Sequence, residues 1–194
     1  GEMVTVPKGR FIYQEEDDEE DKINLKEFSI MKFPATNALY AQFDPQHKTR
    51  YPRYSWEEDQ PVIGINYFES VIFSLWLGLR LPTEKEWEKA ARGTDGRVYP
   101  WGEAMGYEKG FANTCDFMEC KTNSVTELEP GMSPYGCFDM AGNVWEWCMQ
   151  LNASKHSTTR IVRGGSWMNY LVHAKCFFRN SFDPAARYLA VGLR

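Results

Sequence analysis

The segment Arg160-Ile-Val-Arg-Gly-Gly-Ser-Trp167 opens the last part of a chain of 194 residues. Its two consecutive glycines permit a tight backbone path that a side chain would obstruct. Arg163 and Trp167 of this segment, with Arg179 and Arg187 further on, form a set that we call the frame. Tyr, Phe, Val and Ala residues fill the positions between them. Large apolar residues are unusual between turn-forming residues. These residues between the frame positions, which we call the filling, therefore need an explanation of their own.

Three helices are predicted upstream of the frame. The first covers residues 37–43 and ends before a proline. The second begins at Asn66, with Glu69 three residues on, and the third begins at Thr83, followed by Glu86. Both pairs have the form of a capping box, in which each side chain bonds the backbone amide of the other residue. The apolar residues of the two longer helices share one face in each; they are Val71, Ile72, Leu75 and Trp76 in the second and Trp87, Ala90 and Ala91 in the third.

Short strands are predicted at both ends of the chain, where apolar residues alternate between Pro and Gly breaks. They cover residues 3–7, 9–13, 24–30, 160–162 and 188–193, and the part after residue 94 consists mostly of loops until the last strands begin. Helices come early and strands return at the end, so the order indicates an α+β fold and not a parallel doubly wound sheet.

The net charge of −5 argues against the basic surface that nucleic-acid binding needs. Much of this charge lies in the run Glu15 to Asp21, which is typical of a solvated loop between two strands; a cation-binding role is the alternative. No apolar run reaches the length of a membrane span, and no signal peptide is visible.

Five cysteines are an odd number, which argues against a full disulfide framework. Cys115 and Cys120 are expected either to pair across a loop or to remain free thiols. The cysteine count therefore does not decide the cellular compartment, and the cell surface and the cytoplasm are the two alternatives.

Several motifs follow one another along the chain. They are Arg80-Leu-Pro-Thr-Glu-Lys-Glu-Trp-Glu-Lys-Ala-Ala-Arg-Gly93, Tyr99-Pro-Trp-Gly102, Ala112-Asn113, Tyr135-Gly-Cys-Phe-Asp-Met-Ala-Gly-Asn-Val-Trp-Glu-Trp-Cys148 and Arg160-Ile-Val-Arg-Gly-Gly-Ser-Trp167. Their order and spacing resemble the formylglycine-generating-enzyme (sulfatase-modifying factor) family over essentially the whole chain. The resemblance implies a single domain, residues 1–194, with a C-type-lectin-like α+β fold: a small twisted antiparallel sheet, two main helices and extensive loops.

The resemblance also implies calcium. Matching positions in the family bind Ca²⁺ through the side chains of Asp139 and Glu146 and the carbonyls of Gly142 and Val144. Hard oxygens of this kind are what Ca²⁺ prefers, so we expect one structural calcium there; the alternative is that both carboxylates bond backbone amides. A second family site would involve Asn113 and Thr114, but the following loop, Cys115 to Val125, departs from the family pattern.

The catalytic positions differ from those of the family. Active members carry a redox-active, copper-binding cysteine pair, of which the first lies three residues after the serine of Gly-Gly-Ser and the second five residues later. Asn169 and Ala174 occupy these positions. Neither side chain supplies a thiolate for copper or oxygen chemistry, so we expect neither bound copper nor enzymatic activity. A relocated pair of Cys176 with Cys148 is a minor alternative.

The filling of residues 160–194 is instead predicted to bind a ligand, because exposed clusters of Tyr and Phe mark binding surfaces. The predicted ligand-binding positions, which we call the display residues, are Asn169, Tyr170, Val172, His173, Phe178, Ser181, Phe182, Ala186, Tyr188, Leu189 and Ala190. Six of them are expected to share one exposed face and to have no role in the core: Tyr170, His173, Phe178, Phe182, Tyr188 and Leu189. Ordinary core and strand residues are the alternative reading.

The display residues share a genetic property: each amino acid can be reached from an AAC codon by changing its adenines alone. The property, the C-terminal position and the preceding Arg-Gly-Gly-Ser-Trp resemble the variable region of diversity-generating-retroelement proteins, which use the same lectin-like fold. Met168 does not fit the codon rule, and Lys175 is an exception among the neighbouring residues.

The sequence therefore predicts a non-catalytic variable protein that binds a protein or other macromolecular ligand through its C-terminal face. Two alternatives remain open. One is an oxidoreductase of the formylglycine-generating type with an altered centre. The other is an invariant pseudoenzyme that binds a sulfatase-like partner.

Overall fold

The strands form three small sheets in the computed structural model, which describes residues 1–14, 20–47, 50–102, 110–117, 119–151 and 158–194. Two sheets are antiparallel pairs near the N-terminus, β1 with β4 and β2 with β3. The third has four strands in the order β7-β6-β5-β8, with β8 parallel to β5. The strands are β1 (Met3–Val6), β2 (Gly9–Gln14), β3 (Glu20–Leu25), β4 (Phe28–Met31), β5 (Trp145–Leu151), β6 (Arg160–Arg163), β7 (Arg179–Phe182) and β8 (Val191–Gly192).

These strands correct the sequence-based boundaries in three places. The strand predicted over residues 24–30 is divided between β3 and β4. Strand β5 falls where mostly loops were expected, and the strand predicted over residues 188–193 shrinks to the two residues of β8. The acidic loop of residues 15–19 lies outside the described residues, but β2 and β3 flank it as expected. The α+β class is confirmed.

Each predicted helix is present: α1 (Asn37–Ala41), α2 (Tyr67–Trp76) and α3 (Glu84–Arg92). Asn66 and Thr83 form complete capping boxes with Glu69 and Glu86, because these side chains meet amides that the helix itself leaves unpaired. Single-turn 3-10 segments, η2 (Cys115–Phe117), η3 (Glu129–Gly131) and η4 (Leu171–Ala174), interrupt the loops. None of the described helices is long and apolar enough to cross a membrane.

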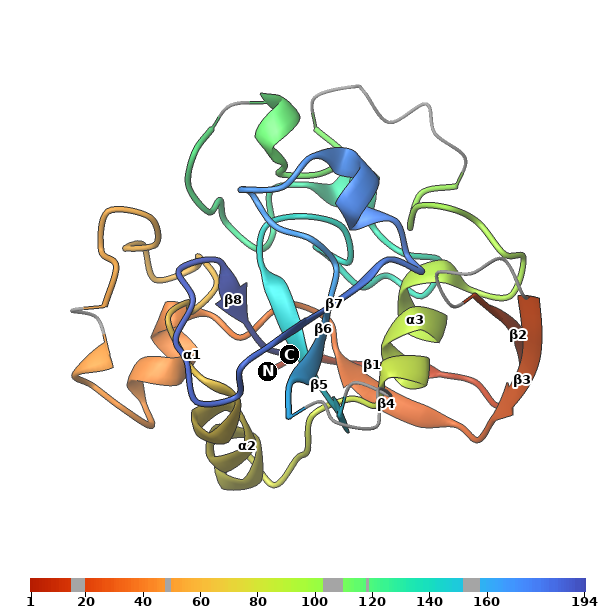
Figure 1. The fold of residues 1–194 in the computed structure, drawn as a ribbon, viewed down its shortest axis with the longest axis horizontal. Helices are drawn as coiled ribbons and strands as arrows, with labels where there is room; N and C mark the ends of the chain where they lie inside the picture. Colours follow the sequence, from red (N-terminus) through yellow and green to blue (C-terminus); the bar gives the residue numbers. More distant parts are fainter. Residues whose placement is uncertain (15–19, 48–49, 103–109, 118, 152–157) are drawn as a thin grey trace.

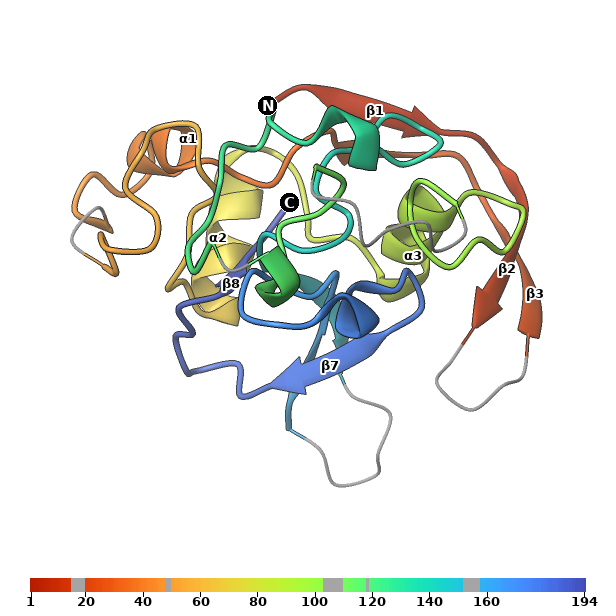
Figure 2. The ribbon, with the colours of Figure 1, turned by 90° about the horizontal axis from the view of Figure 1, so that it is seen from above.

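Helix α3 lies between the four-stranded sheet and the β2–β3 hairpin, as Figures 1 and 2 both show. Its predicted apolar residues are fully buried, and Trp87 is 0% exposed. Its charged residues Glu84, Glu88 and Arg92 are buried as well. A helix that is buried nearly all round must pair its charges internally, because an unpaired charge away from water is costly.

Helix α2 packs in a way that the sequence did not predict. Its buried residues are Tyr67, Ser70, Phe73 and Ser74. The apolar face predicted from the sequence points outward, with Ile72, Leu75 and Trp76 exposed. The outward face of α2 is therefore apolar, whereas half of the inward face consists of serines.

Candidate functional site

The Gly164-Gly165 turn fixes the path of the chain into the candidate site. Both glycines have positive φ, 99° and 71°, which L side chains rarely adopt. A Cβ on Gly164 would lie 3.1 Å from the Trp87 ring, and one on Gly165 would lie 3.0 Å from the carbonyl oxygen of His173. The tight path expected from the sequence is therefore required by both conformation and space.

Buried ion pairs connect the frame to α3. The Arg163 guanidinium bonds the Glu88 carboxylate and lies 3.3 Å from Glu84. Arg179 lies 2.8 Å from the other oxygen of Glu84. Arg163 also donates to the carbonyl of Phe178 at 2.8 Å. One arginine thus connects α3, β6 and the start of β7 at the base of the site.

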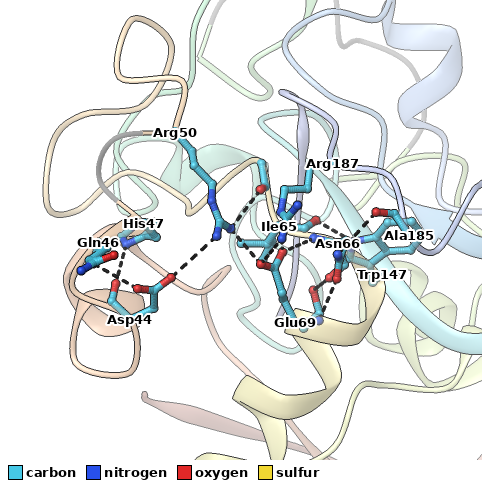
Figure 3. Close-up of polar contacts among 12 residues, drawn as sticks. Asp44, Gln46, His47, Arg50, Ile65, Asn66, Glu69, Trp147, Ala185 and Arg187 are labelled. Atoms are coloured by element: carbon cyan, nitrogen blue, oxygen red, sulfur yellow. Dashed lines mark hydrogen bonds and ion pairs between the residues drawn. The ribbon is translucent and has the colours of Figure 1, made fainter.

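Arg187 holds the loop after β7 against α2, as Figure 3 shows. Its guanidinium donates to both oxygens of Glu69, at 3.0 and 2.7 Å, and Arg50 reaches the same carboxylate at 3.0 Å. Partial burial alone would raise the pKa of Glu69, but hydrogen bonds from Arg187 and Asn66 and the charge of Arg50 lower it. The carboxylate that caps α2 therefore also anchors the display segment.

Asn169, which the family resemblance places at the first cysteine position, forms hydrogen bonds within the protein. Its Oδ1 accepts from Ser166 Oγ at 2.6 Å and from Trp145 Nε1 at 2.8 Å. Its carbonyl accepts from the amide of Cys115 at 2.8 Å. Ala174, at the second position, is 0% exposed. The Asn169 side-chain amide thus bridges Ser166 and Trp145.

The display residues differ widely in exposure. Tyr170 and Val172 are 60% and 47% exposed, on and beside η4. Ala190, directly before β8, is buried at 7% exposed, and its carbonyl accepts from the amide of Trp145. Its assignment as a ligand contact was therefore wrong. The remaining display residues are partly buried; they are Asn169, His173, Phe178, Ser181, Phe182, Ala186, Tyr188 and Leu189.

Some of the partly buried display residues form a continuous row of rings. His173 meets Phe178 edge to face at 5.0 Å between ring centroids, and Tyr188 stacks on Phe182 at 4.5 Å. The Trp145 ring lies between these two pairs, 6.2 Å from Phe178 and 6.3 Å from Phe182. The prediction that these side chains lie together holds for this row, but the prediction that they have no role in the core was wrong. Phe178, Phe182 and Tyr188 pack against the main hydrophobic cluster.

Two exposed features near Tyr170 were missed from the sequence. Met168, which does not fit the codon rule and was not included among the display residues, is 50% exposed. Tyr54 stacks on the frame residue Trp167 at 5.2 Å, and nearby in sequence Trp56 is 47% exposed. The loop of residues 50–56 has no periodic sequence pattern, so its contact with Trp167 is visible from the structure and not from the sequence.

The thiols give no substitute centre among the described residues. All five cysteines are free, so Cys115 and Cys120 do not pair. Cys148 and Cys176 are fully buried, and burial raises the pKa of both thiols. A buried neutral thiol is a poor nucleophile and a poor metal ligand, so the relocated pair is not supported.

The four predicted calcium positions fit a cation in part. Asp139 is buried with one oxygen, Oδ1, lacking any partner, and burial raises the pKa of its carboxyl to about 7. Glu146, by contrast, receives two hydrogen bonds of 2.7 Å from Arg194 and one of 2.6 Å from Trp87. No group of three acidic, His or Cys side chains among the described residues could hold a metal. Backbone carbonyls would therefore have to supply most ligands.

Comparison with known proteins identifies the family. A sequence model of the sulfatase-modifying factor enzyme 1-like domain matches residues 1–194. The chain is 34% identical over 151 residues to serine/threonine-protein kinase pkn1 of Chlamydia pneumoniae, covering 69% of this chain and 23% of that protein. It is 34% identical over 119 residues to inactive C-alpha-formylglycine-generating enzyme 2 of Bos taurus, covering 56% of this chain and 39% of that one.

The chain therefore belongs to the sulfatase-modifying factor family. It spans less than half the length of these two relatives. Among solved structures, Treponema denticola variable protein 1 superimposes with a TM-score of 0.86 at 20% identity, covering 98% of this chain and 92% of that one. This similarity confirms the C-type-lectin-like fold of the formylglycine-generating type.

Substitutions should separate the exposed display residues from the bound ones. Tyr170→Ser should change the free energy of unfolding by no more than about 0.5 kcal/mol, the usual surface range. Asn169→Ala should cost about 1–3 kcal/mol, because the Trp145 and Ser166 donors lose their acceptor. Phe182→Ser should cost about 2–4 kcal/mol, because it removes a ring from the main cluster. Denaturant unfolding measures all three. Equal costs at Tyr170 and Phe182 would contradict the division.

Proposed function

We propose that this chain is a non-catalytic, ligand-binding variable protein of the diversity-generating-retroelement type. The observation that carries the proposal is the contrast around η4. Asn169 is held by hydrogen bonds and Ala174 is buried, whereas Tyr170 and Val172 protrude. A turn that is anchored at its base and apolar at its exposed tip is suited to protein recognition, since Tyr and Val add contact area with few rotors to freeze.

Fewer of the display residues are exposed than the sequence predicted, so the exposed part of the proposed ligand surface is small. Tyr170 and Val172, with Met168 beside them, form its exposed tip. The half-buried row from His173 to Tyr188 forms its floor. A macromolecular ligand fits such a surface better than a small molecule, because side chains that stand out from a surface bury area against a flat or concave partner. The fold shared with a variable protein supports this assignment.

An altered formylglycine-generating oxidoreductase is less well supported. Asn169 has its Oδ1 occupied by Trp145 and Ser166, and the buried thiols have raised pKa values. We therefore expect no turnover when the protein is incubated with copper(I), oxygen and a cysteine-containing sulfatase peptide. Formation of formylglycine above a protein-free control would overturn the non-catalytic proposal.

The coding sequence tests the variable-protein proposal directly. We expect a reverse transcriptase gene near this gene, and a near-copy of its coding end with adenines at the codons of Tyr170, Val172 and His173. Isolates should then differ at these codons and agree at Arg163 and Trp167. An identical coding end in all isolates, without such a copy, would favour the invariant pseudoenzyme that binds a sulfatase-like partner.

We also propose calcium binding at Asp139, with the carbonyls of Gly142 and Val144. The partnerless oxygen of the buried Asp139 carboxylate supports it, since a buried anion gains most from a cation. Glu146 would share its charge with Arg194. Bound calcium would neutralise Asp139 and brace the loop that leads into β5.

Calcium should therefore raise the melting temperature of the wild-type protein, because it binds the folded state. Asp139→Ala should abolish that rise, while Glu127→Ala, a change to a nearby acidic residue, should preserve it. Thermal melts with calcium and with chelator measure the effect. Equal melting temperatures in both buffers would remove calcium from this account.

A further inference from the structure

The outer edge of strand β4 is open. In the described part of the chain, β4 pairs with β1 alone. The amide of Lys32 donates to the carbonyl of Glu2, which marks these two residues as a hydrogen-bonded pair, and such pairs recur at every second residue of an antiparallel ladder. With the register of the two strands, Phe28 and Ile30 therefore direct their backbone polar groups toward β1. Ser29, between them, directs its own away from β1.

The open edge of β4 is centred on Ser29. This residue is exposed, and its backbone N–H and C=O have no hydrogen-bond partner among the described residues. The next outward carbonyl along β4, that of Met31, is already bonded by Arg194 at 3.2 Å. A backbone donor and acceptor left open on a strand edge are the groups with which another peptide strand pairs.

A groove of about 500 Å³ runs along this edge. Its one wall consists of the consecutive residues 27–31, and its other wall includes Phe73, Leu77 and Leu79, at and beyond the end of α2. Consecutive residues of a strand line a groove at the strand's edge, because on the face of a sheet alternate residues would line it. The groove therefore has backbone along one wall and apolar side chains along the other, which is the form of a site that accepts an added strand.

Three lysines surround the continuation of the groove beyond the start of β4. Lys8, Lys26 and Lys85 are exposed, and none has an ion pair with a described residue. The acidic side chains beside them are Glu27 and Glu86, of which Glu86 is already bound by an arginine. This end of the groove therefore carries a surplus of positive charge, in a chain whose net charge is −5. Such a surplus attracts an acidic partner.

We propose that the groove beside β4 binds an extended, acidic peptide segment of a partner protein, which adds to β4 as a further strand. Its backbone would bond Ser29, its apolar side chains would contact Leu77 and Leu79, and its carboxylates would lie near Lys26 and Lys85. A peptide backbone repeats N–H and C=O groups at the spacing of a strand, which neither a lipid nor a nucleic acid does. The open edge thus selects a peptide, and the lysines select an acidic one.

This peptide site is separate from the display tip. In Figure 1, β4 lies in the lower half of the molecule, and η4, which carries Val172, lies near the top. A peptide added to β4 would therefore leave the tip uncovered. The peptide site does not depend on the proposed ligand function, and either proposal can fail without the other.

Fluorescence anisotropy with labelled peptides tests the proposal. The probes are fluorescein-labelled Val-Leu-Thr-Val-Asp-Glu-Asp and the same residues in reverse order, because a strand can add in either direction. The wild type should bind at least one of them with a dissociation constant in the micromolar range. A copy of that peptide with its four central peptide nitrogens methylated should bind at least about tenfold more weakly, because it has lost the donors that would face β4.

Substitutions in the protein test both parts of the site. The double variant Lys26→Glu with Lys85→Glu should bind the acidic peptide at least about tenfold more weakly, with an unchanged thermal melt because both side chains are exposed. Lys22→Glu, a change to an exposed lysine of β3 outside the groove, should bind like the wild type. Ser29→Pro removes an outward donor and leaves the hydrogen bonds to β1 in place, so it should weaken binding as well.

Three results would overturn the proposal. They are a wild type that binds neither acidic peptide, a methylated peptide that binds as well as the unmodified one, and a double lysine variant that binds as well as the wild type. Binding of phosphatidylserine vesicles through Lys26 and Lys85, without binding of either peptide, would assign the lysines to a lipid surface. If Ser29→Pro fails to fold, the methylated peptide tests the same hydrogen bonds from the partner's side.

Discussion

The ion pairs between Arg163 and the carboxylates of α3 are the constraint on which the C-terminal segment depends. Arg163 is completely buried between Glu84 and Glu88, and it holds the Phe178 carbonyl as well. A buried charge is tolerated when it is fully paired. Removing one partner leaves the other charge buried without compensation for its lost hydration. The start of β7 is therefore fixed by polar contacts as well as by the packing of Phe178 and Phe182, and it does not rely on the exposed side chains of Tyr170 and Val172.

A second buried pair secures the very end of the chain. Arg194 bonds both oxygens of Glu146 and also donates to the carbonyls of Met31 and Phe138. Together with Arg187 on Glu69, these contacts tie residues 160–194 to α2, α3 and β5. The exposed tip at Tyr170 lies between such anchors, so its side chains can change without loosening the fold. This arrangement is what a variable binding surface requires, and it is compatible with an invariant pseudoenzyme too.

Local chemistry made some features predictable from sequence, and tertiary packing hid others. The caps at Asn66 and Thr83 were predictable because both partners of a capping box lie within four residues. Strand β5 was missed because Trp145 to Cys148 are all buried, and a strand covered on both faces shows no alternation. Among the display residues, exposure at Tyr170 followed from its loop context. The burial of Ala190 depends on tertiary packing beside Trp145, whose amide bonds its carbonyl, and no local pattern records such a contact.

Helix α2 shows the same limit most clearly. Its apolar residues were predictable as one face, but the direction of that face was not. Ser70 and Ser74 lie inside because each hydroxyl donates to the carbonyl four residues before it, at 2.9 and 2.8 Å, which satisfies the polar group within the helix. Serine can therefore occupy the buried face of a helix, and in α2 the apolar residues lie on the exposed face.

Hydrogen exchange of the β6 and β7 amides tests most directly the claim that the C-terminal segment depends on buried arginines and not on the exposed side chains of Met168, Tyr170 and Val172. The comparison is between Arg163→Met and a triple variant in which Met168, Tyr170 and Val172 are all serine. We expect Arg163→Met to lower the protection of β6 and β7 strongly, since an unpaired buried carboxylate costs about 3–5 kcal/mol. The triple variant should retain wild-type protection. Loss of protection in the triple variant, or its retention in Arg163→Met, would contradict the separation of the frame from the exposed tip.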